Sequence, residues 1–172
     1  MKNLLEQLTQ YAAYHRDRRN IATHFVGIPM IVLAVEVLLS RPTLGVAGVT
    51  PALLAVVLAS LYYLKLDGRL GGVMTVLLAL GLGGAQWCAA QSTAWWLSVG
   101  VGLFVLGWVI QFIGHYFEGR KPAFVDDLMG LIIGPLFVVA ELGFLLGLRL
   151  ELRREIEAQV GSTVLRQRQA HA

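Results

Sequence analysis

Five long apolar runs fill most of this 172-residue chain and constrain its fold more than any other feature. Each run is close to the roughly 20 residues that a helix needs to cross the hydrocarbon core of a bilayer. Hydrophobic residues make up 56% of the chain and charged residues only 15%, far from the balance of a soluble globular domain. We therefore predict an all-α, polytopic membrane helical bundle with four to five hydrophobic segments. Their approximate limits are 21–40, 44–64, 70–90, 94–114 and 128–148.

The N-terminal region is predicted to form a further helix outside the hydrocarbon. Its apolar positions recur at helical spacing, and Asn3 with Glu6 resembles a helix-capping pair. We expect an amphipathic helix over residues 3–18 that lies on the membrane surface. Its apolar stripe consists of Leu4, Leu8, Tyr11 and His15.

The remaining sequence leaves no room for a separate soluble domain. We expect one membrane domain over the whole chain, with an interfacial helix in 1–20, a hydrophobic bundle in 21–148 and a charged cytoplasmic tail in 149–172. The first residues lack the uninterrupted apolar core and the small-residue cleavage site of a signal peptide. No N-terminal segment is therefore expected to be removed.

Lysine and arginine predict the topology, because they collect in the cytoplasmic flanks of membrane spans. They concentrate in 1–20, 65–69, 115–127 and 149–172, whereas the opposite turns hold only Arg41. All four basic regions can be cytoplasmic if the first four apolar segments cross and the fifth does not complete a crossing. We predict a multi-pass integral protein of the inner (plasma) membrane in a bacterium, or of the endoplasmic reticulum in a eukaryote.

The fifth segment, 128–148, differs from the other four. It contains several glycines, a Gly-Pro pair at 134–135 and the ionisable Glu141. Such an interrupted segment suits a re-entrant or broken helix that is buried in protein or lines a cavity. The Gly-Ile-Pro at 27–29 is a second such breaker, and we expect both to bend the backbone around a cavity. Five full spans with a translocated tail is the alternative.

Three of the four histidines lie where charged sequence meets apolar sequence, on one predicted face of the membrane. These are His15, His24 and His115, whereas His171 lies in the charged tail and is expected to be solvated. Imidazole is the commonest metal-ligating side chain and is rare within hydrocarbon. Each histidine alone could be an interfacial residue that bonds a carbonyl, but together they favour a shared metal site on the cytoplasmic side. Because Cys88 is the only cysteine, the ligands must be nitrogen and oxygen.

Polar residues at helical spacing support this site. Asn20 and His24 are separated by four residues, and Gln111, His115 and Glu118 follow at i, i+4 and i+7, so each set shares one helix face. Glu118 could be a fourth ligand, a proton shuttle or a partner that orients an imidazole, or else an exposed carboxylate at a helix end. Asn20 could cap the first span or bond a ligand histidine, and the sequence does not separate these roles.

Four other carboxylates have simpler interpretations. Asp126 and Asp127 precede an apolar helix and are predicted to cap it rather than to bind metal. Glu36 and Glu141 lie within apolar segments, where pairing with each other or with a backbone donor is as good an explanation as catalysis.

The polar positions form motifs in three stretches of the chain. They are His15, Asn20, His24, Gly27, Ile28 and Pro29, then Gln111, Gly114, His115, Phe117, Glu118, Pro122 and Ala123, and finally Gly134 and Pro135. With these motifs the chain resembles the membrane-embedded 2-hydroxy fatty acid dioxygenases, whose fungal member acts in phytosphingosine breakdown. The resemblance implies an Fe(II)-dependent α-oxidation, in which a 2-hydroxy fatty acid and O2 give a fatty acid one carbon shorter with loss of CO2. It also implies that His15, His24 and His115 are the iron ligands.

This chemistry is physically reasonable for the residues present. Non-haem iron that activates O2 needs a few nitrogen or oxygen ligands on one side and open positions on the other. A 2-hydroxy acid can chelate iron through its hydroxyl and carboxylate, while Arg120 or Lys121 neutralises the remaining charge. Glu118, Asn20 and Gln111 are the further catalytic candidates. The expected partners are the lipid-like 2-hydroxy fatty acid, O2 and the bilayer, without nucleic acid, and the oligomeric state stays open.

Three other classes of membrane protein compete with this interpretation. Membrane hydroxylases with two iron ions use many more histidines than the three available here. A small transporter is an alternative because Glu36, Glu141 and interrupted helices also suit an ion path, and a scaffold without chemistry is another. A transporter would concentrate its polar residues near the midplane, whereas the three histidines lie at one edge. Zinc competes with iron for imidazole ligands.

Overall fold

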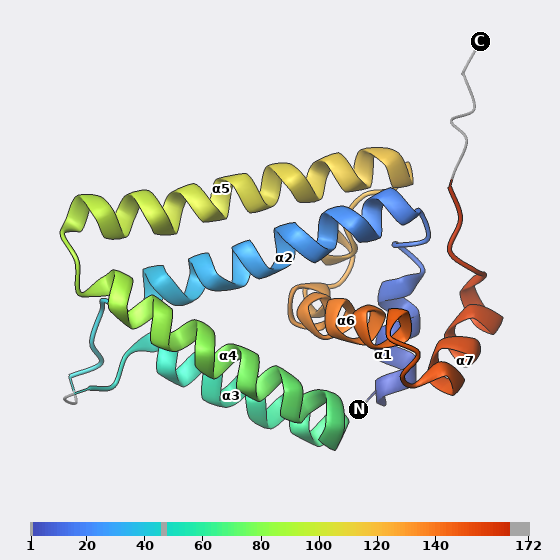
Figure 1. Cartoon of the computed structure of the whole chain (residues 1–172), viewed down its shortest axis with the longest axis horizontal. Helices are drawn as coiled ribbons and strands as arrows, with labels where there is room; N and C mark the ends of the chain where they lie inside the picture. Colours follow the sequence, from blue (N-terminus) through green and yellow to red (C-terminus); the bar gives the residue numbers. More distant parts are fainter. Residues whose placement is uncertain (1, 46–47, 166–172) are drawn as a thin grey trace, which may run out of the picture. The chain divides into compact units, whose positions relative to one another are not determined.

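The computed structural model describes residues 2–45 and 48–165, and within these ranges the chain is helical and contains no strand (Figure 1). The prediction of an all-α fold is confirmed. The helices are α1 (Leu4–Ala12), α2 (Arg18–Leu39), α3 (Pro51–Leu66), α4 (Gly68–Ala89), α5 (Thr93–Glu118), the 3-10 turn η1 (Ala123–Val125), α6 (Met129–Leu145) and α7 (Leu150–Val160).

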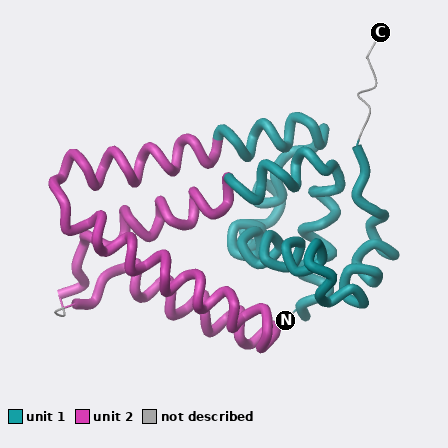
Figure 2. Tube along the Cα trace, in the orientation of Figure 1, with its two compact units in different colours: residues 1–26, 109–172 teal, residues 27–108 magenta. Residues whose placement is uncertain are grey.

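The described chain divides into two compact units, which Figure 2 colours separately. Unit 1 comprises the described parts of 1–26 and 109–172, and unit 2 comprises those of 27–108. The first unit therefore contains α1, α6, α7, the start of α2 and the end of α5. The second contains α3, α4 and the remaining parts of α2 and α5. That the whole chain acts as one membrane domain stays a prediction.

Three of the described helices, α2, α4 and α5, are long and apolar enough to cross a membrane. Helices α6 and α7 form a bent pair, and the number of candidate spans rises to four if this pair is taken as a single span. These helices confirm the expected membrane helical bundle. The predicted segment 44–64 is corrected, since its helix α3 begins only at Pro51 and has 16 residues, fewer than the roughly 20 of a full crossing.

The break in the fifth segment lies at a different place from the predicted one. Helix α6 continues through Pro135, and α2 likewise continues through Pro29, so neither proline ends its helix. The chain turns only after α6, where Gly147 and Arg149 have φ values of 77° and 53°, and α7 leaves at 114° to α6. Apolar helices tolerate an internal proline when neighbouring groups satisfy the carbonyl that it leaves free.

Helix α1 begins as predicted but ends early. Asn3 and Glu6 form the expected capping box, whereas the helix stops at Ala12 instead of residue 18. His15 therefore lies in the non-helical segment 13–17 and not on a helical stripe. The apolar face of α1 packs within unit 1, where it contacts α6 and α7, and Leu8 is fully buried. Protein side chains, rather than a membrane surface, thus cover this face.

Within unit 1, helices α2 and α5 approach each other closely at Gly114. A Cβ atom at this position would collide with the side chains of Thr23 and Asn20. Only glycine fits without displacing one of them. The approach brings the start of α2 against the end of α5, where Asn20, His24 and His115 lie.

Candidate metal centre

Three imidazoles meet in the interior of unit 1. His15 comes from segment 13–17, His24 from α2 and His115 from α5. One ligand atom from each lies within 4.8 Å of the others. The three residues are 0%, 2% and 7% exposed, respectively. The convergence that the sequence predicted is therefore present in the structure.

Backbone carbonyls determine the tautomers of two of these rings. The Nδ1 atoms of His15 and His24 lie 2.7 Å from the Tyr11 carbonyl oxygen and 2.8 Å from the Asn20 carbonyl oxygen. A carbonyl only accepts, so both Nδ1 atoms carry the proton and donate it. In a neutral ring the Nε2 atom then presents a lone pair. Hydrogen bonding of this kind orients metal-ligating histidines in general.

The two Nε2 atoms face each other at 2.9 Å. Two lone pairs cannot bond one another, so this arrangement suits a cation held by both. Nitrogen ligands about 2.1 Å from an ion lie about 3.0 Å apart when they subtend a right angle. The Nδ1 atom of His115 is buried and has no hydrogen-bond partner among the described residues. The donor set therefore fits a divalent metal that accepts imidazole, such as iron or zinc.

Aromatic rings shield His15 from water. The Tyr11 ring stacks on it at 4.1 Å with an interplanar angle of 6°, and the Phe137 ring lies at 5.6 Å. Burial, followed by the neighbouring imidazole of His24, holds the pKa of His15 well below its usual value. The ring is thus neutral near pH 7, as a metal ligand must be.

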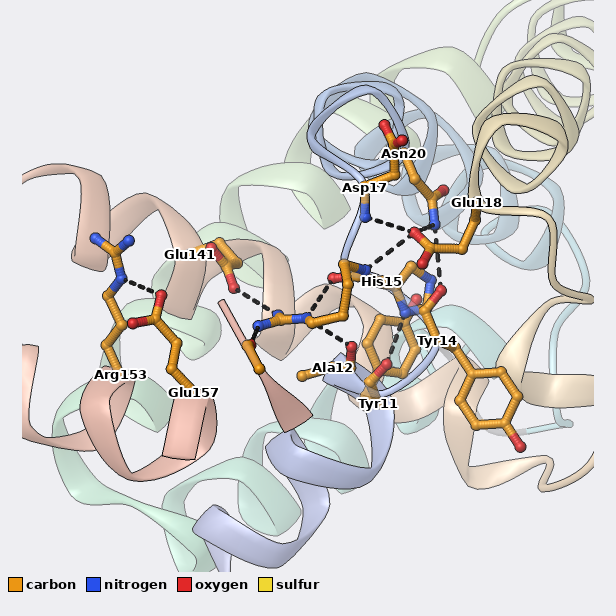
Figure 3. Close-up of polar contacts among 12 residues, drawn as sticks. Tyr11, Ala12, Tyr14, His15, Asp17, Asn20, Glu118, Glu141, Arg153 and Glu157 are labelled. Carbon is orange, nitrogen blue, oxygen red and sulfur yellow. Dashed lines mark hydrogen bonds and ion pairs between the residues drawn. The ribbon is translucent and has the colours of Figure 1, made fainter. Parts of the chain in front are cut away.

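Glu118 joins the end of α5 to the segment that carries His15 (Figure 3). Its Oε2 atom accepts from the backbone N–H groups of Arg16 and Asp17 at 3.0 and 2.8 Å, and from Asn20 Nδ2 at 3.0 Å. The side chain is buried, which excludes the exposed helix-end carboxylate considered from the sequence. These contacts explain why α1 ends early, because the Arg16 and Asp17 N–H groups that would continue the helix bond Glu118 instead.

Asn20 and Gln111 differ in how their amides are satisfied. The Asn20 side chain donates to Glu118 and to the Tyr14 carbonyl, while its backbone carbonyl accepts from His24. Gln111 is buried one turn before His115, and neither atom of its amide has a partner in the part of the chain that the structure describes. A buried amide without hydrogen-bond partners lowers the stability of the folded protein, because it has lost its bonds to water. Gln111 is therefore suited to bond a substrate or a water at this site.

The two cations predicted to bind substrate already have protein partners. Arg120 Nη1 donates to the Ala13 carbonyl at 2.9 Å. Lys121 is 58% exposed, and its Nζ atom lies 2.5 Å from Asp126 Oδ1. The hydrogen bond to that carboxylate raises the pKa of Lys121. Their role toward substrate stays a prediction. Asp127 accepts from the Met129 N–H at 2.9 Å, but the N-cap position of α6 is Leu128, so the prediction that Asp127 caps this helix is wrong.

Asp126 does not cap α6 through any contact found in the structure. Besides Lys121 it binds the Tyr14 hydroxyl, which donates to it at 2.8 Å. Both residues line a small hollow that reaches Tyr11, the residue stacked on His15. Gln7 and Gln10 also line this hollow, together with apolar residues such as Met129 and Ile133.

Sequence reasoning missed one residue of this region. Arg16 was counted only as a topology signal, yet its guanidinium is buried beside His15 and faces Glu141 at 3.7 Å. Glu141 thus lies opposite an arginine rather than another carboxylate. Glu36 lies in unit 2, where its carboxylate abuts Gly81 of α4. The sequence feature that could have pointed to a role for Arg16 at this site is its position directly after His15.

Comparison with known proteins gives one consistent result. The family described as 2-hydroxy-palmitic acid dioxygenase Mpo1-like matches residues 1–146. The chain is 32% identical over 160 residues to a Saccharomyces cerevisiae protein described as 2-hydroxy-palmitic acid dioxygenase MPO1. That alignment covers 90% of this chain and 88% of the yeast protein. No solved structure matches the chain significantly. All three clustered histidines lie within the matched family region.

Proposed function

The chain belongs to the Mpo1-like family of 2-hydroxy-palmitic acid dioxygenases, and from this premise we propose that it is an Fe(II)-dependent enzyme that shortens 2-hydroxy fatty acids by one carbon. The observation that carries the proposal is the buried cluster of His15, His24 and His115. These three side chains would hold the metal. When bound, Fe(II) supplies Lewis acidity and the redox chemistry that activates O2.

The proposed reaction balances without an added reductant. One 2-hydroxy acid and one O2 give one acid shortened by a carbon, one CO2 and one water. The bond between C1 and C2 breaks, C1 leaves as CO2, and C2 becomes the new carboxyl carbon. The substrate supplies all the electrons that reduce O2. We therefore expect turnover with only substrate, O2 and the Fe(II)-loaded protein.

The chain's own residues prepare the site in three ways. The carbonyls of Tyr11 and Asn20 hold His15 and His24 with their Nε2 lone pairs facing each other. The Tyr11 and Phe137 rings exclude water from His15. The side-chain amide of Gln111, which has no hydrogen-bond partner among the described residues, is proposed to bond the hydroxyl or carboxylate of the substrate. Family membership favours this function over the transporter and scaffold alternatives.

The 2-hydroxyl should matter more than the length of the acyl chain. One buried methylene contributes about 0.8 kcal/mol, roughly a fourfold effect, whereas removal of the hydroxyl eliminates a proposed chelating atom and the group oxidised at C2. We expect long-chain 2-hydroxy acids to give the shortened acid, a homologue lacking one methylene to react only a few times more slowly, and the unsubstituted acid to give essentially no product.

Mass spectrometry of the products tests this directly. Substrate labelled with ¹³C at C1 should release labelled CO2 and an unlabelled acid one carbon shorter, under aerobic and Fe(II)-replete conditions. Protein loaded with Zn(II) is the control and should be inactive. Equal shortening of hydroxylated and unsubstituted acids, or of neither, would contradict the proposal.

A further inference from the structure

A buried arginine lies next to His15, which is the one member of the three-histidine cluster that lies outside a helix. The Arg16 side chain is almost fully buried, and its Nε atom donates to the carbonyls of Ala12 and His15, both at 2.9 Å. One of these carbonyls ends α1 and the other belongs to the histidine itself. Arg16 therefore ties the backbone of His15 to the end of α1.

The same arginine also contacts the C-terminal part of unit 1. Its Nη1 atom donates to the Gly161 carbonyl at 3.0 Å. The backbone of Val164 pairs with this segment as well, since its N–H donates to the Arg16 carbonyl at 2.9 Å and its carbonyl accepts from the Arg18 N–H at 3.0 Å. Gly161 and Val164 both lie beyond the family match, which ends at residue 146.

A carboxylate of α6 completes the surroundings of Arg16. Glu141 Oε1 lies 3.7 Å from Arg16 Nη2 (Figure 3), and Nη2 has no hydrogen-bond partner within residues 2–45 and 48–165. The backbone N–H of Arg16 donates to Glu118 of α5. One residue thus connects the His15 segment with α1, α5, α6 and the segment after α7.

We infer that Arg16 is a positioning residue for the metal centre, which holds His15 in place by tying segment 13–17 to Glu141 and to the C-terminal segment 161–165. This inference rests on the proposed function, because it takes His15 as a ligand. His24 and His115 have helices to fix their backbones, whereas His15 depends on these tertiary contacts. Residues that orient metal ligands typically contribute 10- to 100-fold to metal affinity.

The test compares two arginines, each paired with a glutamate of unit 1. Arg16→Met removes the side-chain contacts of Arg16 with the Ala12, His15 and Gly161 carbonyls and with Glu141. Arg153→Met is the matched control, since Arg153 is partly exposed and its Nε atom donates to Glu157, four residues on in the same helix α7, at 2.9 Å. Co(II) serves as the probe, because its absorption spectrum reports ligand geometry. We expect Arg16→Met to bind Co(II) about 10- to 100-fold more weakly with an altered spectrum, and Arg153→Met to match the wild type.

A second full-length variant keeps the test decisive if Arg16→Met does not fold. Glu141→Gln preserves the shape of the side chain and removes only its charge. We expect Glu141→Gln to weaken Co(II) binding as well, because Glu141 faces Arg16.

The outcomes separate this inference from the proposed function. A lowered unfolding temperature of the metal-free Arg16→Met variant, with wild-type Co(II) affinity and spectrum, would show a purely structural arginine and overturn the inference alone. Normal Co(II) binding by Glu141→Gln would do the same. A wild-type chain that binds neither Co(II) nor Fe(II) would overturn the proposed metal site and the inference together.

Discussion

His15 and His24 make the same kind of hydrogen bond, but their backbones are held in different ways. His24 bonds the carbonyl one turn earlier in its own helix. His15 makes the same kind of bond to Tyr11 although it lies outside a helix, and Glu118 and Arg16 hold its segment. The sequence predicted which histidines would meet, because their spacing from polar neighbours and from apolar runs is visible locally. It did not predict how His15 is held, because Glu118 lies 102 residues further along the chain than Arg16.

Glu118 is predicted to support metal binding indirectly, by holding segment 13–17, which carries His15. Glu118→Gln keeps the size of the side chain but replaces one carboxylate oxygen with an amide that donates. It should weaken the hydrogen bonds from Arg16, Asp17 and Asn20 and lower metal affinity about 10- to 100-fold. Competition titration with a metal-binding dye measures this affinity. Glu155→Gln, in α7, is the control, and equal affinity of both variants with the wild type would contradict the assignment.

Among the elements, hydropathy predicted the long helices well. The apolar runs at 21–40, 70–90 and 94–114 became parts of α2, α4 and α5, because a run of this length can satisfy its backbone only within a helix. The ends of α1 and α6 were predicted less well. Tertiary hydrogen bonds end α1, whereas left-handed residues after α6 turn the chain, and neither cause appears in local periodicity.

A further prediction concerns Gly114 of α5, the position where α2 lies closest to this helix. Gly114→Ala should push α2 and α5 apart, since its Cβ would collide with Thr23 and Asn20. Metal affinity and the unfolding temperature should both fall. Gly102→Ala is the matched control in the same helix, because a Cβ at that position meets nothing within 4 Å. It should be neutral or stabilising by up to about 1 kcal/mol.

Thermal unfolding and metal titration of the two glycine variants check this prediction. If Gly114→Ala behaves like Gly102→Ala in both measurements, the close approach is not required for the site.

For the whole molecule, the composition predicted a membrane bundle but could not fix the number of crossings. Three described helices qualify as spans, and the bent pair α6 and α7 adds at most one. Helix α1 contacts α7 within unit 1. This contact agrees with the N-terminal region and α7 lying on the same side of the membrane, whereas the assignment of that side to the cytoplasm stays a prediction. Arg166, Arg168 and His171 lie outside the described residues.

Cysteine accessibility tests this topology. In a Cys88→Ser background, single cysteines at Lys2 and Gln159, both exposed, should react with a membrane-impermeant reagent from the same side. A cysteine at Arg41, in a turn predicted to face the other side, should react from the opposite side. Labelling of Lys2 and Gln159 from different sides would establish an odd number of crossings between them.

The central claim is that His15, His24 and His115 hold iron together, and the iron content of anaerobically purified protein tests it most directly. We expect about one Fe(II) per chain in the wild type and in His171→Ala, and essentially none in His15→Ala, His24→Ala or His115→Ala, with membrane insertion intact in all of them. Iron retained by any of the three cluster variants, or a wild-type protein that carries zinc and gains no activity with Fe(II), would contradict the account.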